Sequence, residues 1–328
     1  MARLFLIARS FAPALVSICA AATAFCQQTA DIRVDVDLVT VACAADTRDG
    51  QPMSGLKAED FHLLDNGQAR EIRNFWQEAD LPLTVALVAD VSGSQTEFVS
   101  SHREAIAQFL KQVVGRRDRA MVVELAQKVW QISGLTGSAS DLSAAVEKIG
   151  APEAKRSRQL GPNCRNATMP HSCGGTALWH GIYYTAQELK PIAGRKAIIV
   201  LSDGVDTGSD VSLNDLVEQT QKAGVVVYAI KYTSAMRFLS LGGTIAQAVS
   251  HGLDRLPRET GGLTFANPGR KNADVFARIE ADLRNMYVLG FAPPVEARDG
   301  KFHKLDVKIT RPGVTVRSRA GYWAQNPE

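Results

Sequence analysis

The chain has 328 residues, a formal net charge of +3 and an ordinary globular composition, with 45% hydrophobic and 22% charged residues. A chain of this length can form one large domain or two smaller ones. No block of Lys or Arg stands out, so nothing electrostatic favours nucleic acid as a partner.

The N-terminus has the pattern of a secretory signal peptide. Arg3 and Arg9 flank the start of an uncharged stretch whose apolar core is 11–25, and Ala22-Thr23-Ala24 gives an A-x-A cleavage site. We therefore predict a signal peptide over residues 1–24 and an exported protein, periplasmic or extracellular. The apolar core is short for an uncleaved membrane anchor, and no later segment is predicted to cross a membrane.

Lipid attachment at Cys26 is a further possibility for an exported chain. Phe25, directly before that cysteine, is bulkier than the residues that usually precede a lipoprotein cleavage site. The sequence therefore argues against a lipid anchor.

The next segment, 25–80, is predicted to be a short β region. Residues 32–43 alternate hydrophobic and polar side chains, which is typical of an antiparallel strand with one exposed face. Strand-like runs at 61–64 and 71–75 flank Asp65-Asn66-Gly67, a strong hairpin signal.

The middle of the chain, 81–285, alternates strand and helix patterns. Near-continuous apolar runs predict buried strands at 81–90, 196–202 and 225–230, and shorter strands are predicted at 120–125, 129–132 and 263–266. Helical patterns fall at 96–114, 140–149, 176–189, 212–224, 244–256 and 274–284, and a long polar loop covers 150–175. This alternation predicts an α/β fold, a doubly wound and mostly parallel sheet with helices on both faces.

The last segment, 286–328, returns to β patterns, with strand-like runs at 287–291, 304–309 and 314–319. Together with the N-terminal strands they predict one small β-sandwich built from both termini, into which the α/β domain is inserted. Two separate β units are the alternative.

Export also changes the meaning of the cysteines. Removal of the signal peptide leaves four, and an even number in an oxidising compartment favours disulfides, with three possible pairings. Cys164 and Cys173 share one loop rich in Gly, Pro and Asn, so we predict a disulfide between them and leave the pairing of Cys26 and Cys43 open. Zinc binding is a weaker alternative, because the nearby His171 and His180 complete no ligand spacing.

Oxygen-bearing side chains gather at three predicted element ends. The set comprises Asp90, Ser92 and Ser94 after the strand at 81–90, Thr176 at a helix start and Asp203 after the strand at 196–202. Functional residues of a parallel sheet gather at the carboxyl ends of its strands. Two carboxylates and three hydroxyls form an all-oxygen, weakly anionic site, which suits Mg²⁺ and could also accept Ca²⁺ or Mn²⁺.

The local spacing has a physical reason. Side chains at alternate positions can turn toward one point if the loop after the strand bends sharply, and Gly93 is expected to permit that bend. Gly174 and Gly175 are expected to do the same before Thr176. Asp206 is either an acceptor around the site or a turn residue.

Asp-x-Ser-x-Ser, a later Thr and a later Asp-Gly resemble the metal-ion-dependent adhesion site of von Willebrand factor type A (VWA) domains, with all five positions filled. The resemblance covers about 81–284. The flanking sequences GLKAEDFHLLDNGQAREIRNF and NMYVLGFAPP, with the C-terminal strands, resemble the exported bacterial proteins of the VWFA-related, acidobacterial-type family.

This resemblance implies specific roles. Ser92 and Ser94 would bind the metal directly, and Thr176 directly or through water. Asp90 and Asp203 would act mostly through water or as acceptors around the ion. A carboxylate from a partner would then take the open coordination position of the Mg²⁺.

We therefore expect a non-catalytic, exported binding or adhesion module whose partner is a protein or matrix ligand with an acidic group. One alternative is a structural envelope protein with a fold-stabilising metal, and another is a metal-dependent hydrolase. The sequence contains no Gly-x-Ser-x-Gly, Walker loop or dinucleotide glycine fingerprint, and Ser92 stands where a haloacid-dehalogenase-like site needs a second acid.

Overall fold

A computed structural model describes residues 38–77, 82–115, 117–152, 158–161, 175–233, 251–266 and 272–324. The predicted signal peptide, Cys26, His171 and the predicted Cys164–Cys173 disulfide lie outside these residues. Cys43 is buried with a free thiol. Among the described residues, no helix is both long enough and apolar enough to span a membrane.

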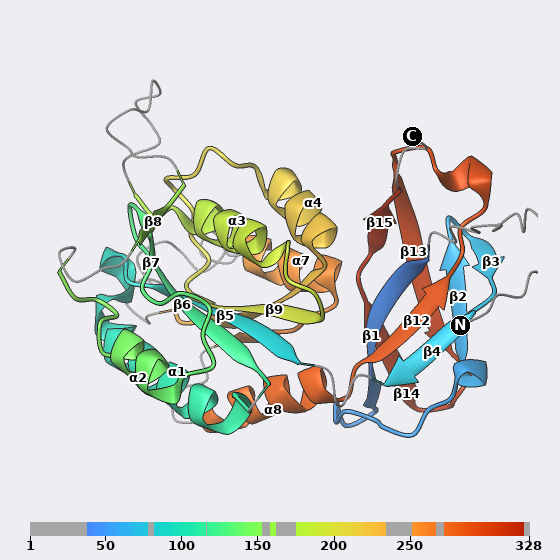
Figure 1. Cartoon of the computed structure of the whole chain (residues 1–328), viewed down its shortest axis with the longest axis horizontal. Coiled ribbons are helices and arrows are strands. Elements are labelled where there is room, and N and C mark those ends of the chain that lie inside the picture. The colour runs from blue at the N-terminus through green and yellow to red at the C-terminus, as the bar shows by residue number, and fades with distance from the viewer. Residues whose placement is uncertain are drawn as a thin grey trace, which may run out of the picture. The chain divides into compact units, whose positions relative to one another are not determined.

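A seven-stranded sheet forms the centre of the α/β part, in the order β11-β10-β9-β5-β6-β7-β8 (Figure 1). Its strands are β5 (Leu83–Asp90), β6 (Arg119–Leu125), β7 (Val129–Gln131), β8 (Arg158–Leu160), β9 (Arg195–Ser202), β10 (Val225–Lys231) and β11 (Thr264–Ala266). The sheet is parallel from β11 to β6, and β7 pairs antiparallel with both neighbours. Every residue of β5 is buried, as its apolar run predicts for a strand covered on both faces.

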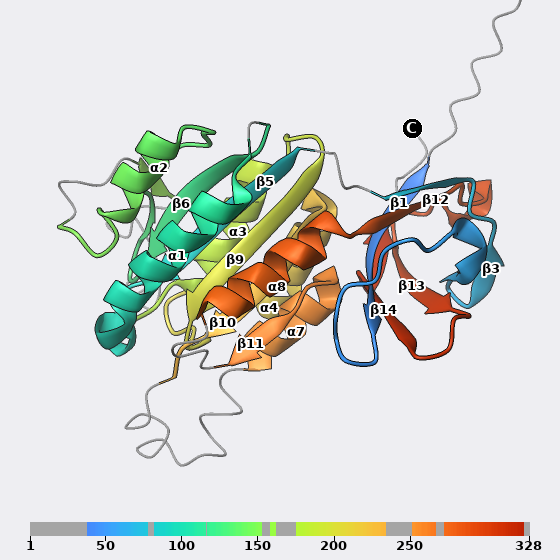
Figure 2. The ribbon, with the colours of Figure 1, turned by 90° about the horizontal axis from the view of Figure 1, so that it is seen from below.

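Helices cover both faces of this sheet. One face carries α1 (Val99–Val113), α2 (Ala139–Val146) and α8 (Asn272–Arg284), and the other carries α3 (Leu178–Leu189), α4 (Leu213–Ala223) and α7 (His251–Thr260) (Figures 1 and 2). The predicted doubly wound fold is therefore confirmed.

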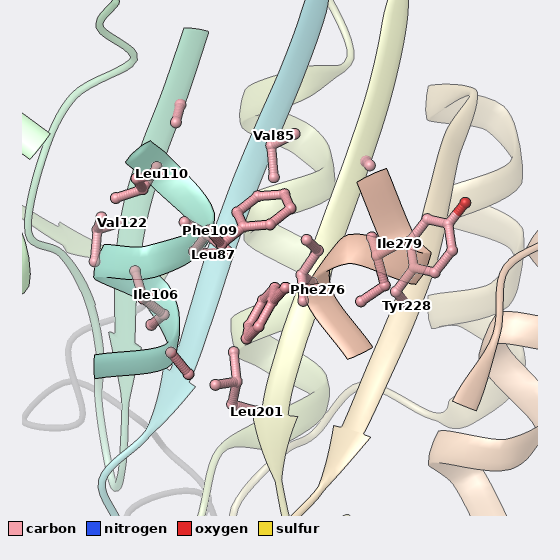
Figure 3. Packing of buried hydrophobic residues seen from close by; sticks show 14 of the residues in the cluster. Val85, Leu87, Ile106, Phe109, Leu110, Val122, Leu201, Tyr228, Phe276 and Ile279 are labelled. Atoms are coloured by element: carbon pink, nitrogen blue, oxygen red, sulfur yellow. The ribbon is translucent and has the colours of Figure 1, made fainter. Parts of the chain in front are cut away.

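Aromatic and aliphatic side chains fill the layer between the sheet and the first group of helices. Phe109 of α1 and Phe276 of α8 meet at a centroid distance of 5.0 Å, over Leu87 and Leu201 of the sheet (Figure 3). Full burial of one such side chain is worth about 1.5–3 kcal/mol. This packing fixes the strands whose ends carry the candidate site.

Capping residues define both ends of α4. The Ser212 hydroxyl accepts a hydrogen bond from the Asp215 N–H, which caps the first turn. Gly224 ends the helix in the left-handed conformation, with φ of 64°.

Two four-stranded antiparallel sheets form the β-sandwich. One has the order β14-β1-β12-β4 and the other β15-β13-β2-β3. Their strands are β1 (Val39–Thr47), β2 (Phe61–Asp65), β3 (Gln68–Arg70), β4 (Asn74–Gln77), β12 (Tyr287–Phe291), β13 (Phe302–Ile309), β14 (Val314–Ser318) and β15 (Gly321–Trp323), with short 3₁₀ turns η1 (Ala58–Asp60) and η6 (Val295–Ala297). Both sheets mix N-terminal and C-terminal strands, so the predicted shared sandwich is confirmed and the alternative of two separate β units is wrong.

The predicted hairpin forms, but its second strand is Gln68–Arg70, and the expected position at 71–75 is wrong. Asn66 and Gly67 make a two-residue turn with φ of 48° and 80°, and pairing ends at Arg70. The chain then crosses to the other sheet, where Phe75 packs against Phe61 and Tyr287. Packing in the aromatic cluster between the sheets therefore accompanies the change of sheet, and the hairpin does not continue past Arg70.

A buried charge cluster joins the sandwich to the α/β part. Arg317 of β14 pairs with Asp282 of α8 at 2.5 Å and with Asp46 of β1 at 3.0 Å. Arg278 of α8 pairs with Asp46 at 2.6 Å, and the Tyr228 hydroxyl donates to Asp282 at 2.6 Å. Both carboxylates are thus shared between the two parts of the molecule.

Candidate metal centre

The candidate site lies at the point where the winding of the sheet reverses. Strands β5 and β9 are neighbours, but β5 leads to α1 on one face and β9 leads to α4 on the other (Figure 2). Open α/β sheets bind ligands outside the carboxyl ends of strands at such a switch point. Asp90 ends β5, and Asp203 directly follows β9.

Asp90 is fully buried and held by hydrogen bonds at both oxygens. Its Oδ1 accepts from the Ser92 N–H at 2.8 Å, and its Oδ2 accepts from the Ser202 hydroxyl at 2.6 Å. Burial raises the pKa of this carboxyl to about 6, and the charge of Asp203 adds to the rise, although the serine hydrogen bonds oppose it. A buried carboxylate under these conditions is stabilised by a nearby cation.

Ser92 and Ser94 present their hydroxyls side by side. The two Oγ atoms are 3.2 Å apart, with Ser92 buried and Ser94 half-buried. Neighbouring ligands of an octahedral Mg²⁺ with bonds of about 2.1 Å are about 3 Å apart. The hydroxyl pair therefore fits adjacent positions around one small cation.

The bend that brings these serines together does not need glycine. Gly93 begins a 3₁₀ turn, η2 (Gly93–Phe98), without a positive φ, and a Cβ there would meet nothing within 4 Å. The expectation for Gly93 is therefore wrong, because η2 itself turns the chain. Gly175 does behave as expected, with φ of 103° and a Cβ position 2.1 Å from the Thr207 Oγ1; Gly174 lies outside the described residues.

Thr176 is buried, and backbone contacts fix its position. Its N–H donates to the Thr207 hydroxyl at 2.9 Å, and its carbonyl accepts from the N–H groups of Thr207 and Gly208. The loop after β9 therefore holds the residue that opens α3.

Consecutive carbonyls at the end of β6 bring the serine and threonine segments together. The Val91 N–H donates to the Leu125 carbonyl at 2.9 Å, and the Ala177 N–H donates to the Ala126 carbonyl at 2.7 Å. Val91 precedes Ser92 and Ala177 follows Thr176 in the chain. Both segments thus dock on one strand end.

Asp203 completes the set from the β9 side. It is 4% exposed, and its Oδ1 accepts from the Val205 N–H at 3.1 Å. Its negative charge adds to the rise in the pKa of Asp90. In the described part of the chain, no three His, Cys, Asp or Glu side chains form a metal-binding group, so any ion here would depend on hydroxyl ligands.

Three supporting residues were not predicted or were left ambiguous. Ser202 orients Asp90, and Thr207 positions Thr176. Asp206 accepts from the Trp179 N–H at 3.0 Å and from the Ser209 hydroxyl at 2.6 Å, so it fixes the start of α3. The sequence already offered Asp206 as a possible acceptor, and the position of Ser202 directly before Asp203 could have pointed to its role.

Trp179 and His180 follow Thr176 in the chain and lie in α3. Trp179 packs against Gly252 of α7, where a Cβ would come within 2.3 Å of its ring. The buried His180 ring lies 5.6 Å from that of Tyr184, one turn further along the same helix. The first contact joins two helices, and the second is internal to α3.

No protein-family model matches the chain, and no curated protein matches its sequence. Among solved structures, it resembles an aerotolerance-related membrane protein of Bacteroides fragilis, with 13% identity, a TM-score of 0.41 and coverage of 61% of this chain and 98% of the other. It also resembles proximal thread matrix protein 1 of the mussel byssus, solved with a zinc-occupied MIDAS motif, with 16% identity, a TM-score of 0.45 and coverage of 67% and 49%.

A third solved structure is the pilus adhesin SpaC of Lactobacillus rhamnosus GG, with 10% identity, a TM-score of 0.46 and coverage of 81% of this chain and 48% of the adhesin. The match thus spans about half of both the mussel protein and the adhesin. In this chain, the reversal between β5 and β9 and the antiparallel β7 agree with the expected architecture. The α/β part therefore has the doubly wound, mostly parallel fold that the sequence predicts.

Proposed function

We propose that this protein is an exported, divalent-cation-dependent binding module. Ser92, Ser94 and Thr176 would hold Mg²⁺, supported by Asp90 and Asp203. The observation that carries this proposal is the pair of serine hydroxyls, 3.2 Å apart, beside the buried Asp90 at the switch point of the sheet.

The chemistry of the donor set favours recognition of an acid. Hydroxyl ligands carry no charge, so a bound cation would keep much of its positive charge and attract an acidic group from a protein or matrix partner. Mn²⁺ or Ca²⁺ accepts similar oxygen ligands, although Ca²⁺ prefers more of them at longer distances.

A hydrolase is the less favoured function. A nucleophilic serine needs a base within hydrogen-bond reach. In the described part of the site, the Ser92 and Ser94 hydroxyls contact each other, and the Ser92 side chain and the Ser202 hydroxyl both hydrogen-bond to the buried Asp90, which is thus shared between them. This arrangement supports ligation by the serines over their activation.

Calorimetric titration with Mn²⁺ and Mg²⁺ tests the metal site. The purified protein should bind one ion, and D90A should abolish the heat of binding. S94A removes one ligand while leaving Asp90 in place, and should weaken binding about tenfold or more. E104A removes an exposed carboxylate of α1 and should bind as the unmodified protein does. Ion uptake that is the same in all four proteins would refute the proposed ligands.

Partner capture then separates binding from a structural role. The immobilised protein should retain partners from a cell-envelope extract in Mg²⁺ and lose them in chelator, and D90A should match the chelator sample. If the ion raises the midpoint of thermal unfolding but the chelator does not change the partners retained, the metal only stabilises the fold. Metal-dependent ester or peptide turnover by the unmodified protein would favour the hydrolase.

A further inference from the structure

A second candidate site lies where the parallel strands of the central sheet begin, at the end of the sheet opposite to the candidate metal centre. A cavity of about 290 Å³ is found where β9 and β10 begin, and residues of the β-sandwich and of α8 also line it. The candidate metal centre lies at the opposite, carboxyl end of β9. This cavity is therefore separate from the proposed function.

The charge of the cavity lining is one-sided. Arg195, Lys196 and Arg319 all line it, and its described lining contains no Asp or Glu. Arg195 donates to the Leu283 carbonyl at 2.6 Å, and Lys196 donates to the Lys190 carbonyl at 3.3 Å. The carbonyl that Lys196 contacts carries no charge.

Arg319 shows most clearly that the positive charge of the lining is not balanced. Its Nη2 donates to the Thr40 carbonyl at 2.8 Å, but its buried Nε has no hydrogen-bond partner among the described residues. Burial lowers the pKa of Arg319 to about 10, against a small opposing effect of Tyr322, and burial also lowers the pKa of Lys196. Arg317, two residues earlier, is instead paired with the carboxylates of Asp46 and Asp282.

The remaining wall is largely apolar. Trp76, with 36% of its surface exposed, lines the cavity together with the buried Leu283, Met286 and Val288. Ligand pockets typically combine an apolar wall with a few polar groups that fix orientation. Lys196 is half-buried and the Arg319 Nε is buried, and cations in such positions are normally paired, so a ligand that brings a negative charge would compensate them.

We infer that this cavity binds a small organic acid, with its carboxylate on Lys196 and Arg319 and its apolar body against Trp76 and Met286. The volume is at the lower end of the range for ligand pockets, which limits the ligand to a small molecule. Nothing in this inference requires a metal ion.

Titration of the purified protein with benzoate and hexanoate tests the inference, with benzamide and hexanamide as uncharged controls. We expect the acids to bind and the amides to bind at least tenfold more weakly. K196M and R319Q should each weaken acid binding about tenfold, as expected for loss of a charge-assisted hydrogen bond. K111M removes an exposed charge from α1 and should have no effect.

The fluorescence of Trp76 provides a second measurement, which reports where in the protein the acid binds. Acid binding should change the tryptophan fluorescence of the protein, and W76F should lose that change. D90A should keep acid binding even if it abolishes metal uptake, which separates failure of one site from failure of the other. No binding at millimolar acid, equal binding of acids and amides, or equal effects of K196M and K111M would overturn the inference.

Discussion

At the scale of single residues, the candidate metal centre depends on side chains that orient the ligands as much as on the ligands themselves. Asp90 is fixed by the Ser202 hydroxyl, and Thr176 is fixed by Thr207. Partners that orient metal ligands commonly influence affinity by 10- to 100-fold. Two substitutions follow from these contacts.

Replacement of Ser202 by alanine should weaken Mn²⁺ binding about tenfold without removing any proposed ligand. The hydroxyl donates to Asp90 at 2.6 Å and accepts from the Gly204 N–H at 3.1 Å, so its loss frees the carboxylate and the following turn. Calorimetry at pH 7 measures the change. S209A removes a hydroxyl bound to Asp206 instead and should have the smaller effect; the reverse order would argue against this role for Ser202.

Gly175 and Gly93 form a matched pair for a second prediction. G175A places a Cβ 2.1 Å from the Thr207 Oγ1 at a φ of 103°, so it should destabilise the protein by about 1–3 kcal/mol and weaken Mn²⁺ binding. G93A meets nothing within 4 Å and should change the free energy of unfolding by less than about 1 kcal/mol. Urea unfolding of both variants provides the comparison, and equal effects would contradict it.

At the scale of elements, strong periodicity made the parallel strands and their helices predictable. The apolar runs at 81–90 and 196–202 correspond to β5 and β9 within two residues. Strand β8 was missed because it has three residues inside a polar stretch, and β15 was missed because it is equally short. Such strands exist because neighbours pair with them, which a local pattern cannot reveal.

The candidate site was likewise predictable only in part. The pattern predicted that Asp90 and Asp203 stand at the carboxyl ends of neighbouring parallel strands, and they do so at β5 and β9. The contacts of Thr207 and the docking of Ala177 on β6 could not be predicted, since they depend on how two loops fold over the strand ends.

Asp118 anchors two elements and gives a pH prediction. It accepts from the Leu83 N–H at the start of β5, from the Gly115 N–H and from Arg284 at the end of α8. Burial raises the pKa of Asp118, but these hydrogen bonds and the Arg284 charge outweigh it, and the net pKa is lowered. The unfolded chain therefore takes up the proton first as the pH falls, and this contribution to stability is complete above about pH 4 and lost below it.

D118N should accordingly reduce the free energy of unfolding by about 2 kcal/mol at pH 7 and by clearly less at pH 3. Urea unfolding of both proteins at the two pH values measures the difference. A deficit of the same size at both pH values would show that the charge of Asp118 does not matter.

At the scale of the whole molecule, the cluster of Asp46, Arg278, Asp282 and Arg317 couples the sandwich to α8. Removing one member of a buried ion pair leaves the other charge uncompensated, which costs about 3–5 kcal/mol. The two parts should therefore unfold together while the cluster is intact.

R317M should lower stability by about that amount and separate thermal unfolding into two transitions, because Arg278 alone then faces both Asp46 and Asp282. Differential scanning calorimetry reports both effects. R311M breaks the more exposed pair with Asp60 and should cost less than about 1 kcal/mol in a single transition. A single transition for R317M would mean that other contacts suffice to couple the two parts.

The pairing of β4 with β12 has one more consequence. Gln77 pairs with Tyr287, and Trp76 pairs with Val288. The chain therefore leaves the sandwich at the end of β4 and returns to it at the start of β12, directly opposite. Opposed residues in such a ladder have Cα atoms only about 4.5–5.5 Å apart. A tight turn in place of the stretch between Gln77 and Tyr287 is therefore expected to join β4 directly to β12.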